Sequence, residues 1–321
     1  MHLKSDGASL TSSRVADLLG VHSSTVKRWC DDGALVSEKT EGGHRRIRLG
    51  DALETARRQE IRTFLDIFHP WEANVWRAVS EIEDQGTFDR LHNLAVGWLS
   101  RGETDLLGRL FFEVGSRPGL SFPQFLDDGI RVFMARVGEE WREGRLAVGE
   151  EHMASQMVKE ALLLLRPGWD RLRAVGPLRD APPPVAVVGA VEGDHHDLGA
   201  LAIRVLLERE GWKVYYLGAD VPVEEFAGIQ RAQGASLICI SFSPKNSLPD
   251  LLRTVRILEE FFRPQHPYSL ALGGSLGKIS EEMVPAGPFE ARSISRSAQE
   301  LLTWLRTLPG NVNSNDPRRV A

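Results

Sequence analysis

The segment Val185–Gly199, which reads VAVVGAVEGDHHDLG, decides the fold of the C-terminal part of this 321-residue chain. Its first seven residues are a continuous apolar run, which is typical of a strand buried on both faces of a parallel sheet. A polar loop with His195 and His196 follows, and from Leu198 the pattern becomes helical. A strand, a loop and a helix in this order predict the start of an alternating β/α domain.

The same alternation continues through most of the remaining chain. Strands are expected at Lys213–Leu217, Leu237–Ser241 and Leu270–Leu272, and helices at Leu198–Glu210, Val223–Arg231, Leu248–Phe262 and Ser297–Leu305. This pattern predicts a doubly wound, Rossmann-like parallel sheet over residues 181–309, beginning in the proline-rich segment Ala181–Pro184. Residues 310–321 are polar and are expected to form a disordered tail.

Residues 69–180 have helical periodicity and no convincing strand pattern. Helix-breaking residues divide this segment at Gly86, Gly102, Pro118-Gly119 and Gly144. We therefore expect a four-helix bundle that precedes the α/β domain.

Residues 1–68 predict a winged helix-turn-helix. One short helix is expected over Thr11–Gly20 and a second over Ser23–Gly33, and two short strands, Leu35–Lys39 and His44–Arg48, surround a Gly-Gly turn. In such a unit the second helix enters the major groove of DNA and the hairpin reaches the phosphates. The candidate contacts are Ser24, Thr25, Lys27 and Arg28 on the helix and His44, Arg45 and Arg46 on the hairpin.

The hairpin sequence Thr40–Arg46, TEGGHRR, closely resembles the wing of MerR-type and BldC-like DNA-binding domains. The resemblance covers about 60 residues and implies binding to double-stranded operator DNA. The alternative is a helical capping module with an incidental basic loop. Basic and acidic residues nearly balance over residues 1–68, so the clustering of Arg45, Arg46 and Arg48 favours DNA binding.

The composition excludes several classes of protein. The net charge is −5, so a role with nucleic acid must reside in one region. Only two cysteines occur, Cys30 and Cys239, which excludes a disulfide framework and a cysteine-rich zinc site. No apolar run approaches the ~20 residues of a membrane span, and no secretory signal is visible. A cytoplasmic location is expected.

The loop after the first expected strand of the α/β domain has the residues of a metal ligand. A loop that cradles phosphate would be rich in glycine, whereas this one has imidazoles flanked by carboxylates. The spacing Asp194-x-His196-x-x-Gly199 resembles the cobalamin-binding motif of corrinoid proteins. The resemblance implies that His196 replaces the cofactor's benzimidazole as the lower ligand of cobalt, that Asp194 orients its ring, and that Gly199 leaves space for the nucleotide tail. His195 is the competing ligand.

Two further positions support the same resemblance. The motif expects Ser-x-Leu after the third strand of the domain and Gly-Gly after the fourth. Ser241-Phe242-Ser243 has the serine without the leucine, and Gly273-Gly274 is present. Ser241, Gly273 and Gly274 are therefore expected to contact the cofactor's tail.

Trp141 is followed after nine residues by Glu151-His152, a pattern that resembles the CarH/LitR family of cobalamin-dependent, MerR-type, light-responsive regulators. The resemblance covers nearly the whole chain. It implies that Trp141 packs on the adenosyl group of adenosylcobalamin, that Glu151 hydrogen-bonds it, and that Val148 and His152 line the pocket. Where the family has a histidine after the tryptophan, this chain has Arg142. After illumination we therefore expect water on cobalt's upper face.

The resemblance implies a non-enzymatic repressor that binds DNA as a dimer or tetramer in the dark and releases it in light. Three alternatives stay open: a regulator that reports cobalamin level without light, a corrinoid carrier of a methyltransferase system, and a sensor of haem or another tetrapyrrole. The carrier would leave the DNA-binding unit unexplained, and the chain has no room for a substrate barrel of about 250 residues beside its other domains.

Overall fold

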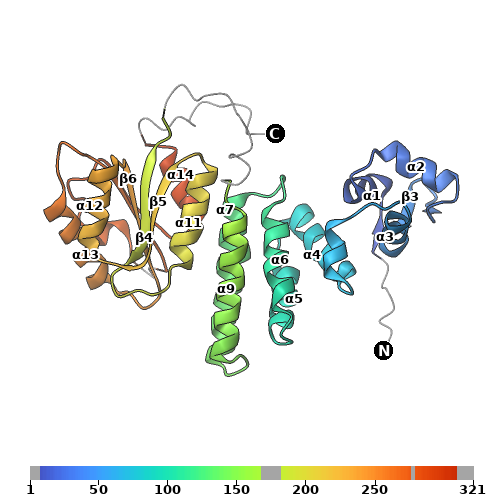
Figure 1. The fold of residues 1–321 in the computed structure, drawn as a ribbon, viewed down its shortest axis with the longest axis horizontal. Helices are drawn as coiled ribbons and strands as arrows, with labels where there is room; N and C mark the ends of the chain where they lie inside the picture. The colour runs from blue at the N-terminus through green and yellow to red at the C-terminus, as the bar shows by residue number, and fades with distance from the viewer. Residues whose placement is uncertain (1–7, 168–181, 276–278, 309–321) are drawn as a thin grey trace. The chain divides into compact units, whose positions relative to one another are not determined.

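The computed structural model describes residues 8–167, 182–275 and 279–308. The chain divides into two compact units, Met1–Glu113 and Val114–Ala321, and each is described by itself (Figure 1). The expected tail, residues 310–321, lies outside the described residues, as does the beginning of the linker at Ala181. Among the described helices, none combines the length and apolarity that a membrane span requires.

The first unit begins with the expected winged helix-turn-helix. Its elements are β1 (Ser9–Leu10), α1 (Ser12–Leu19), α2 (Ser23–Asp31), β2 (Glu38–Lys39), β3 (Arg45–Arg48) and α3 (Leu49–Arg58). Thr11 caps α1 by accepting a hydrogen bond from the backbone N–H of Arg14 at 3.3 Å. Gly20 ends the helix with φ of 63°, a left-handed conformation that favours glycine.

The wing is shorter than expected. β3 lies between β1 and β2, and Glu38 pairs with Arg46 and Lys39 with Arg45 in antiparallel register. Leu35, expected as the first strand residue, instead donates its N–H to the carbonyl of Trp29 and is buried. Leu35 therefore belongs to the turn after α2, and its side chain packs in the core of the unit.

All expected breaks in the helical region fall between helices. The elements from residue 64 to 164 are η1 (Phe64–Phe68), α4 (Glu72–Gln85), α5 (Asp89–Leu99), α6 (Thr104–Gly115), α7 (Phe122–Gln124), η2 (Phe125–Arg131), α8 (Val132–Arg142) and α9 (Val148–Leu164). The π-helical segment η2 joins α7 and α8 without interruption. Within residues 69–167 there are therefore five helical stretches, one more than the four expected: α4, α5, α6, α7–η2–α8 and α9.

The C-terminal part is the expected doubly wound sheet. Its strands, in the order β5-β4-β6-β7-β8, are all parallel: β4 (Val185–Val191), β5 (Lys213–Val221), β6 (Leu237–Phe242), β7 (Ser269–Gly274) and β8 (Arg292–Ser295). The helices that follow the strands are α11 (Leu198–Arg209), α12 (Val223–Gln233), α13 (Leu248–Phe261) and α14 (Ala298–Leu305), with a short η3 (Glu281–Met283) before β8. The sequence reasoning missed β8, because its four residues, RSIS, contain no apolar run.

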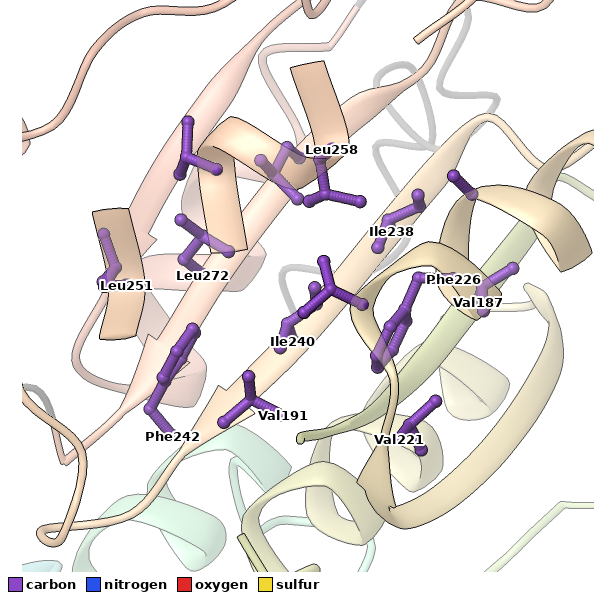
Figure 2. Close-up of a cluster of buried hydrophobic side chains, with 14 of the residues drawn as sticks. Val187, Val191, Val221, Phe226, Ile238, Ile240, Phe242, Leu251, Leu258 and Leu272 are labelled. Atoms are coloured by element: carbon purple, nitrogen blue, oxygen red, sulfur yellow. The ribbon is translucent and has the colours of Figure 1, made fainter. Parts of the chain in front are cut away.

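The sheet separates two layers of helices (Figure 1): α12 and α13 cover one face, and α11 and α14 cover the other. Figure 2 shows the α12–α13 side, where Phe226 and Leu258 pack on Val187, Ile240 and other strand residues of the same face. Since side chains alternate along a strand, Ala186, Val188 and Ala190 of β4 lie on the opposite face, where all three are buried.

The strand order determines where a ligand binds. The chain leaves β4 on one side toward β5 and returns on the other side as β6. In open α/β sheets the crevice at this switch point, beyond the carboxyl ends of the strands, is the ligand site. The loops after β4 and β6 therefore border the candidate site.

Helices α7 to α9 are attached to the sheet domain within the second unit. Asp127 of η2 accepts hydrogen bonds from the backbone N–H groups of Ala298 (2.8 Å) and Gln299 (3.1 Å) at the start of α14. Near the end of α9, Arg166 makes a two-pronged ion pair with Glu208 of α11, with N–O distances of 2.6 and 2.8 Å. These contacts hold both long helices against the same layer.

Candidate functional site

Asp194, which is only 2% exposed, organises the loop after β4 through its carboxylate. Its Oδ1 accepts hydrogen bonds from the backbone N–H and the ring Nδ1 of His196, both at 3.0 Å. Its Oδ2 accepts a hydrogen bond from the backbone N–H of Ser243, at 2.8 Å, in the loop after β6. Asp194 thus joins the two loops that border the switch point.

These hydrogen bonds also determine the charge of Asp194. Burial disfavours the ionised carboxyl, but the hydrogen bonds from His196 and Ser243 together outweigh burial and lower the pKa of Asp194. The residue is therefore a carboxylate at neutral pH. As an acceptor only, it holds a neutral His196 in the tautomer with the proton on Nδ1.

His196 has the geometry of a metal ligand. Its Nδ1 is hydrogen-bonded to Asp194, and its side chain is 55% exposed. The lone pair of Nε2 is therefore available to coordinate a metal. A carboxylate behind a ligating imidazole fixes the ring and makes it a better donor. His195 is exposed and has no hydrogen bond or ion pair with another described residue.

Gly199, in the first turn of α11, lies against Ser241 at the end of β6. A Cβ atom at Gly199 would stand 2.7 Å from the Ser241 hydroxyl oxygen, closer than such contacts allow. At the end of β7, a Cβ atom on Gly274 would stand 2.2 Å from the carbonyl oxygen of Phe242. Glycine at these two positions therefore allows α11 to pack closely on the end of β6 and the end of β7 to pack closely on β6.

The donor set fits a cobalt corrinoid better than a simple metal ion. In residues 8–167, 182–275 and 279–308, no group of three or more histidine, cysteine, aspartate or glutamate side chains is placed to hold a metal. A corrin ring supplies four nitrogen ligands itself, so one oriented imidazole is sufficient. His196, oriented by Asp194, meets that requirement.

The residues expected above the cofactor lie at the α8–α9 turn. Trp141 is 50% exposed and Val148 is 55% exposed, which is unusual for large apolar side chains. Glu151 accepts a hydrogen bond from Ser155 at 3.0 Å, and its other oxygen is 2.6 Å from Nδ1 of His152. Glu151 thus pairs with its neighbour His152 in the first turns of α9.

The turn between Trp141 and Val148 is itself braced. Arg145 donates to Glu140 at 2.9 Å and also pairs with Glu143. The hydrogen bond from Arg145 lowers the pKa of Glu140. Arg142, where the family has a histidine, is exposed at the end of α8.

Helix α9, which follows the turn, links the residues expected above the cofactor to the loop that holds His196. Lys159 of α9 pairs with Asp197 at 2.6 Å, and Asp197 also accepts a hydrogen bond from the Tyr216 hydroxyl at 3.0 Å. Asp197 follows His196 directly. Among the described residues, no hydrogen bond or ion pair joins Trp141, Val148, Glu151 or His152 to Asp194 or His196.

The expected DNA contacts on α2 are accessible. Ser24, Lys27 and Arg28 are exposed, and Thr25 is half-buried. His22 caps the helix, with its Nδ1 accepting from the backbone N–H of Ser24 at 3.3 Å. The N-terminal turn of α2, which enters the groove in a helix-turn-helix, is thus ordered and open.

The wing divides its basic residues between two roles. Arg46 and His44 are exposed. Arg45 pairs with Asp31 at the end of α2, and its side chain is only 18% exposed. Arg45 therefore fixes the hairpin against the recognition helix, whereas Arg46 is free to reach a phosphate.

Three known families match separate parts of the chain. A helix-turn-helix domain family matches residues 9–55, and two B12 binding domain families match residues 99–166 and 184–287. The HTH-type transcriptional repressor CarA of Myxococcus xanthus is 28% identical over 179 residues, covering 52% of this chain and 57% of CarA. The three matches lie in the order that the resemblance to the CarH/LitR family implies: a DNA-binding unit, then a helical part and an α/β part of a B12-binding region.

The part of the chain that matches B12 binding domains also has relatives that are not named as repressors. Dimethylamine corrinoid protein 1 of Methanosarcina acetivorans is 28% identical over 140 residues, covering 43% of this chain and 62% of the relative. Like CarA, it is matched over less than two thirds of its own length. The solved monomethylamine corrinoid protein of Methanosarcina barkeri shares the fold: it covers 69% of this chain and 97% of that protein, with a TM-score of 0.50 and 18% identity.

Several contacts at the site were not expected from the sequence. Lys159 and Tyr216 contact the loop that holds His196, and neither belongs to the motif. Ser243, which stands at the leucine position of Ser-x-Leu, contacts the same loop through its backbone N–H. Their only signal in the sequence is position: Ser243 follows a strand that turns out to neighbour β4. Recognising it requires the strand order.

Proposed function

We propose that this chain is a transcriptional repressor controlled by adenosylcobalamin and by light. The single observation that carries the proposal is the His196–Asp194 pair at the switch point of the sheet, in the same chain as an exposed helix-turn-helix. The similarity to CarA supports repression as the outcome.

In the proposed complex, His196 is the lower ligand of cobalt, and Asp194 keeps its ring oriented. Gly199, Ser241, Gly273 and Gly274 hold the nucleotide tail along the bare ends of the strands. When bound, adenosylcobalamin supplies a cobalt–carbon bond that visible light breaks. All of the proposed cofactor residues belong to the unit Val114–Ala321.

The exposed apolar side chains at the α8–α9 turn are suited to cover the adenosyl group. Trp141 offers a flat surface for stacking on a nucleoside, and Val148 adds apolar contact. Glu151 is positioned to accept hydrogen bonds from the same group. His152 lines the pocket but stays bound to Glu151, and Arg142, always protonated, is not a cobalt ligand.

The DNA-binding part acts through oligomerisation. A single winged helix contacts a small area, so two or four copies in one oligomer raise affinity through effective concentration. Coupling requires that the cofactor favours the oligomeric state. We assign residues 1–68 to DNA binding, 69–180 to the helical cap and 181–309 to cofactor binding, with 310–321 as a tail, and we place the protein in the cytoplasm.

The proposal is tested by measuring binding to a labelled duplex from the region upstream of the gene that encodes this chain. We expect tight binding by protein loaded with adenosylcobalamin in the dark, weak binding without cofactor, and loss of binding after green light. Arg46→Ala is the matched control for specific use of the wing. Equal binding in all three states would contradict the proposal.

The same binding experiment distinguishes two other candidate functions from the proposed one. A regulator that reports cobalamin level would bind DNA equally in dark and light when loaded, and the replacement of histidine by Arg142 favours this candidate. A corrinoid carrier is favoured by the similarity to the dimethylamine corrinoid protein, which is 28% identical to this chain, as CarA is. It would support methyl transfer and would not bind the duplex.

A further inference from the structure

Asp220, which no motif includes, has an unusual backbone conformation beside the candidate cobalt site. It lies near the end of β5, the strand next to β4, with φ of 53°. Among the described residues other than glycine, only Glu60 shares a positive φ. Left-handed backbone is unfavourable for a residue with a Cβ atom, although aspartate tolerates it better than most. Such a conformation persists where surrounding contacts hold it in place.

The contacts that hold Asp220 are both with the loop that presents His196. The carboxylate Oδ1 of Asp220 accepts a hydrogen bond from the backbone N–H of Gly193 at 2.7 Å. The backbone N–H of Asp220 donates to the carbonyl of Asp194 at 2.9 Å. Two consecutive residues of the loop are thus bound by one residue of the neighbouring strand.

The loop is consequently tied to three strands. On β4, the carbonyl of Val191 accepts a hydrogen bond from the N–H of Asp194 at 3.0 Å. Near the end of β5, Asp220 binds the backbone of Gly193 and Asp194. After β6, the N–H of Ser243 donates to the Asp194 carboxylate. Asp220 acts on the main chain and Ser243 on the side chain. Together they fix the acceptor that orients His196.

We propose that Asp220 is a positioning residue for the lower cobalt ligand. It holds the loop in the conformation in which His196 displaces the cofactor's own benzimidazole, so less ordering is needed when the cofactor binds. This inference rests on the proposed role of His196 and assigns a residue of a different strand to the same site.

Three substitutions separate the backbone and side-chain contributions of Asp220. Asp220→Asn keeps an acceptor oxygen and tolerates the left-handed conformation. Asp220→Gly keeps the conformation and loses the acceptor, whereas Asp220→Ala loses the acceptor and strains the backbone. Glu192→Ala is the matched control, because Glu192 is a carboxylate of the same loop that pairs outward with Arg253 at 3.2 Å.

The readout is the nitrogen that binds cobalt. Full-length protein labelled with ¹⁵N-histidine is loaded with cob(II)alamin, and electron paramagnetic resonance distinguishes the labelled imidazole from the unlabelled benzimidazole. Circular dichroism and thermal melting of each variant verify the fold. In Asp220→Gly the ratio of histidine-bound to benzimidazole-bound cofactor should fall about fivefold, the effect of losing one hydrogen bond of ordinary strength. Asp220→Asn and Glu192→Ala should match the wild type, and Asp220→Ala should lose at least as much as Asp220→Gly.

Two results would overturn the inference. An unchanged ratio in a folded Asp220→Gly variant would show that the hydrogen bond to Gly193 does not position the ligand. A loss in Asp220→Asn as large as in Asp220→Gly would do the same. If the wild type itself shows no coupling to labelled histidine, the role of His196 fails as well, and that outcome is visible before any variant is made.

Discussion

Replacing Asp127 with alanine should remove the hydrogen bonds between the long α7–η2–α8 helix and α14, and so lower the free energy of unfolding. The carboxylate of Asp127 is 9% exposed and is the acceptor for two N–H groups in the first turn of α14. Hydrogen bonds to a charged acceptor contribute about 1.5–3 kcal/mol each, and loss of a helix N-cap costs about 1 kcal/mol. Burial of the charge offsets part of this gain, so we expect a loss of about 2 kcal/mol at pH 7.

The loss of stability in Asp127→Ala should depend on pH in a defined direction. Burial raises the pKa of Asp127, and the N–H groups of Ala298 and Gln299 only partly offset it. The folded state therefore binds a proton at Asp127 more tightly than the unfolded chain does. Because of this, protonation of Asp127 stabilises the folded state, and the stabilisation grows as the pH falls through the folded pKa toward about 4. The difference in unfolding free energy between wild type and Asp127→Ala should be smallest at neutral pH and larger near pH 5.

The assay is thermal and urea unfolding of both proteins between about pH 7.5 and pH 5. A loss of about 2 kcal/mol corresponds to a Tm lower by about 4–8 °C for a unit of this size. Asp128→Ala is the control, since Asp128 is exposed beside it and its removal should change stability by less than about 0.5 kcal/mol. Equal losses in the two variants, or a difference that shrinks on acidification, would refute the reasoning.

Three further predictions concern the cofactor and the DNA. His196→Ala should abolish the histidine-bound absorption spectrum of the loaded protein, whereas the exposed His195→Ala should leave it unchanged; the reverse result would reassign the ligand. Arg46→Ala should weaken binding to all DNA sequences alike and lower the slope of log affinity against log salt by about one, as loss of a phosphate contact does. Arg45→Ala should lower the slope less, because that guanidinium already pairs with Asp31; unchanged binding of the double variant would remove the wing from the interface. Arg142→His should place a second imidazole on cobalt after illumination and slow the release of the cofactor, both visible by absorption spectroscopy, and a wild type with that same spectrum would contradict the assignment of Arg142.

Local patterns were sufficient for the elements and the motif. The expected bounds of β4 are those of the structure, and Thr11 and Gly20 cap α1 as expected. Each of these depends on residues close together in the chain: an apolar run, a hydroxyl three residues before an N–H, a glycine at a helix end. The expected hydrogen bond between Asp194 and His196 is confirmed, since it joins residues two positions apart.

Contacts between distant segments were decided only by the tertiary structure. Asp127 reaches Ala298 across 171 positions, Asp194 reaches Ser243 across 49, and Asp220 reaches Gly193 across 27. Apolar periodicity predicts that strands exist but contains no information on which strands are neighbours. The sequence by itself therefore determined the pairing of His196, the proposed ligand, with Asp194, and the order β5-β4-β6 determined which residues hold that pair in place. The physical reason is that a side chain's local neighbours follow from the helix or strand repeat, whereas its partners in other segments follow from how the layers pack.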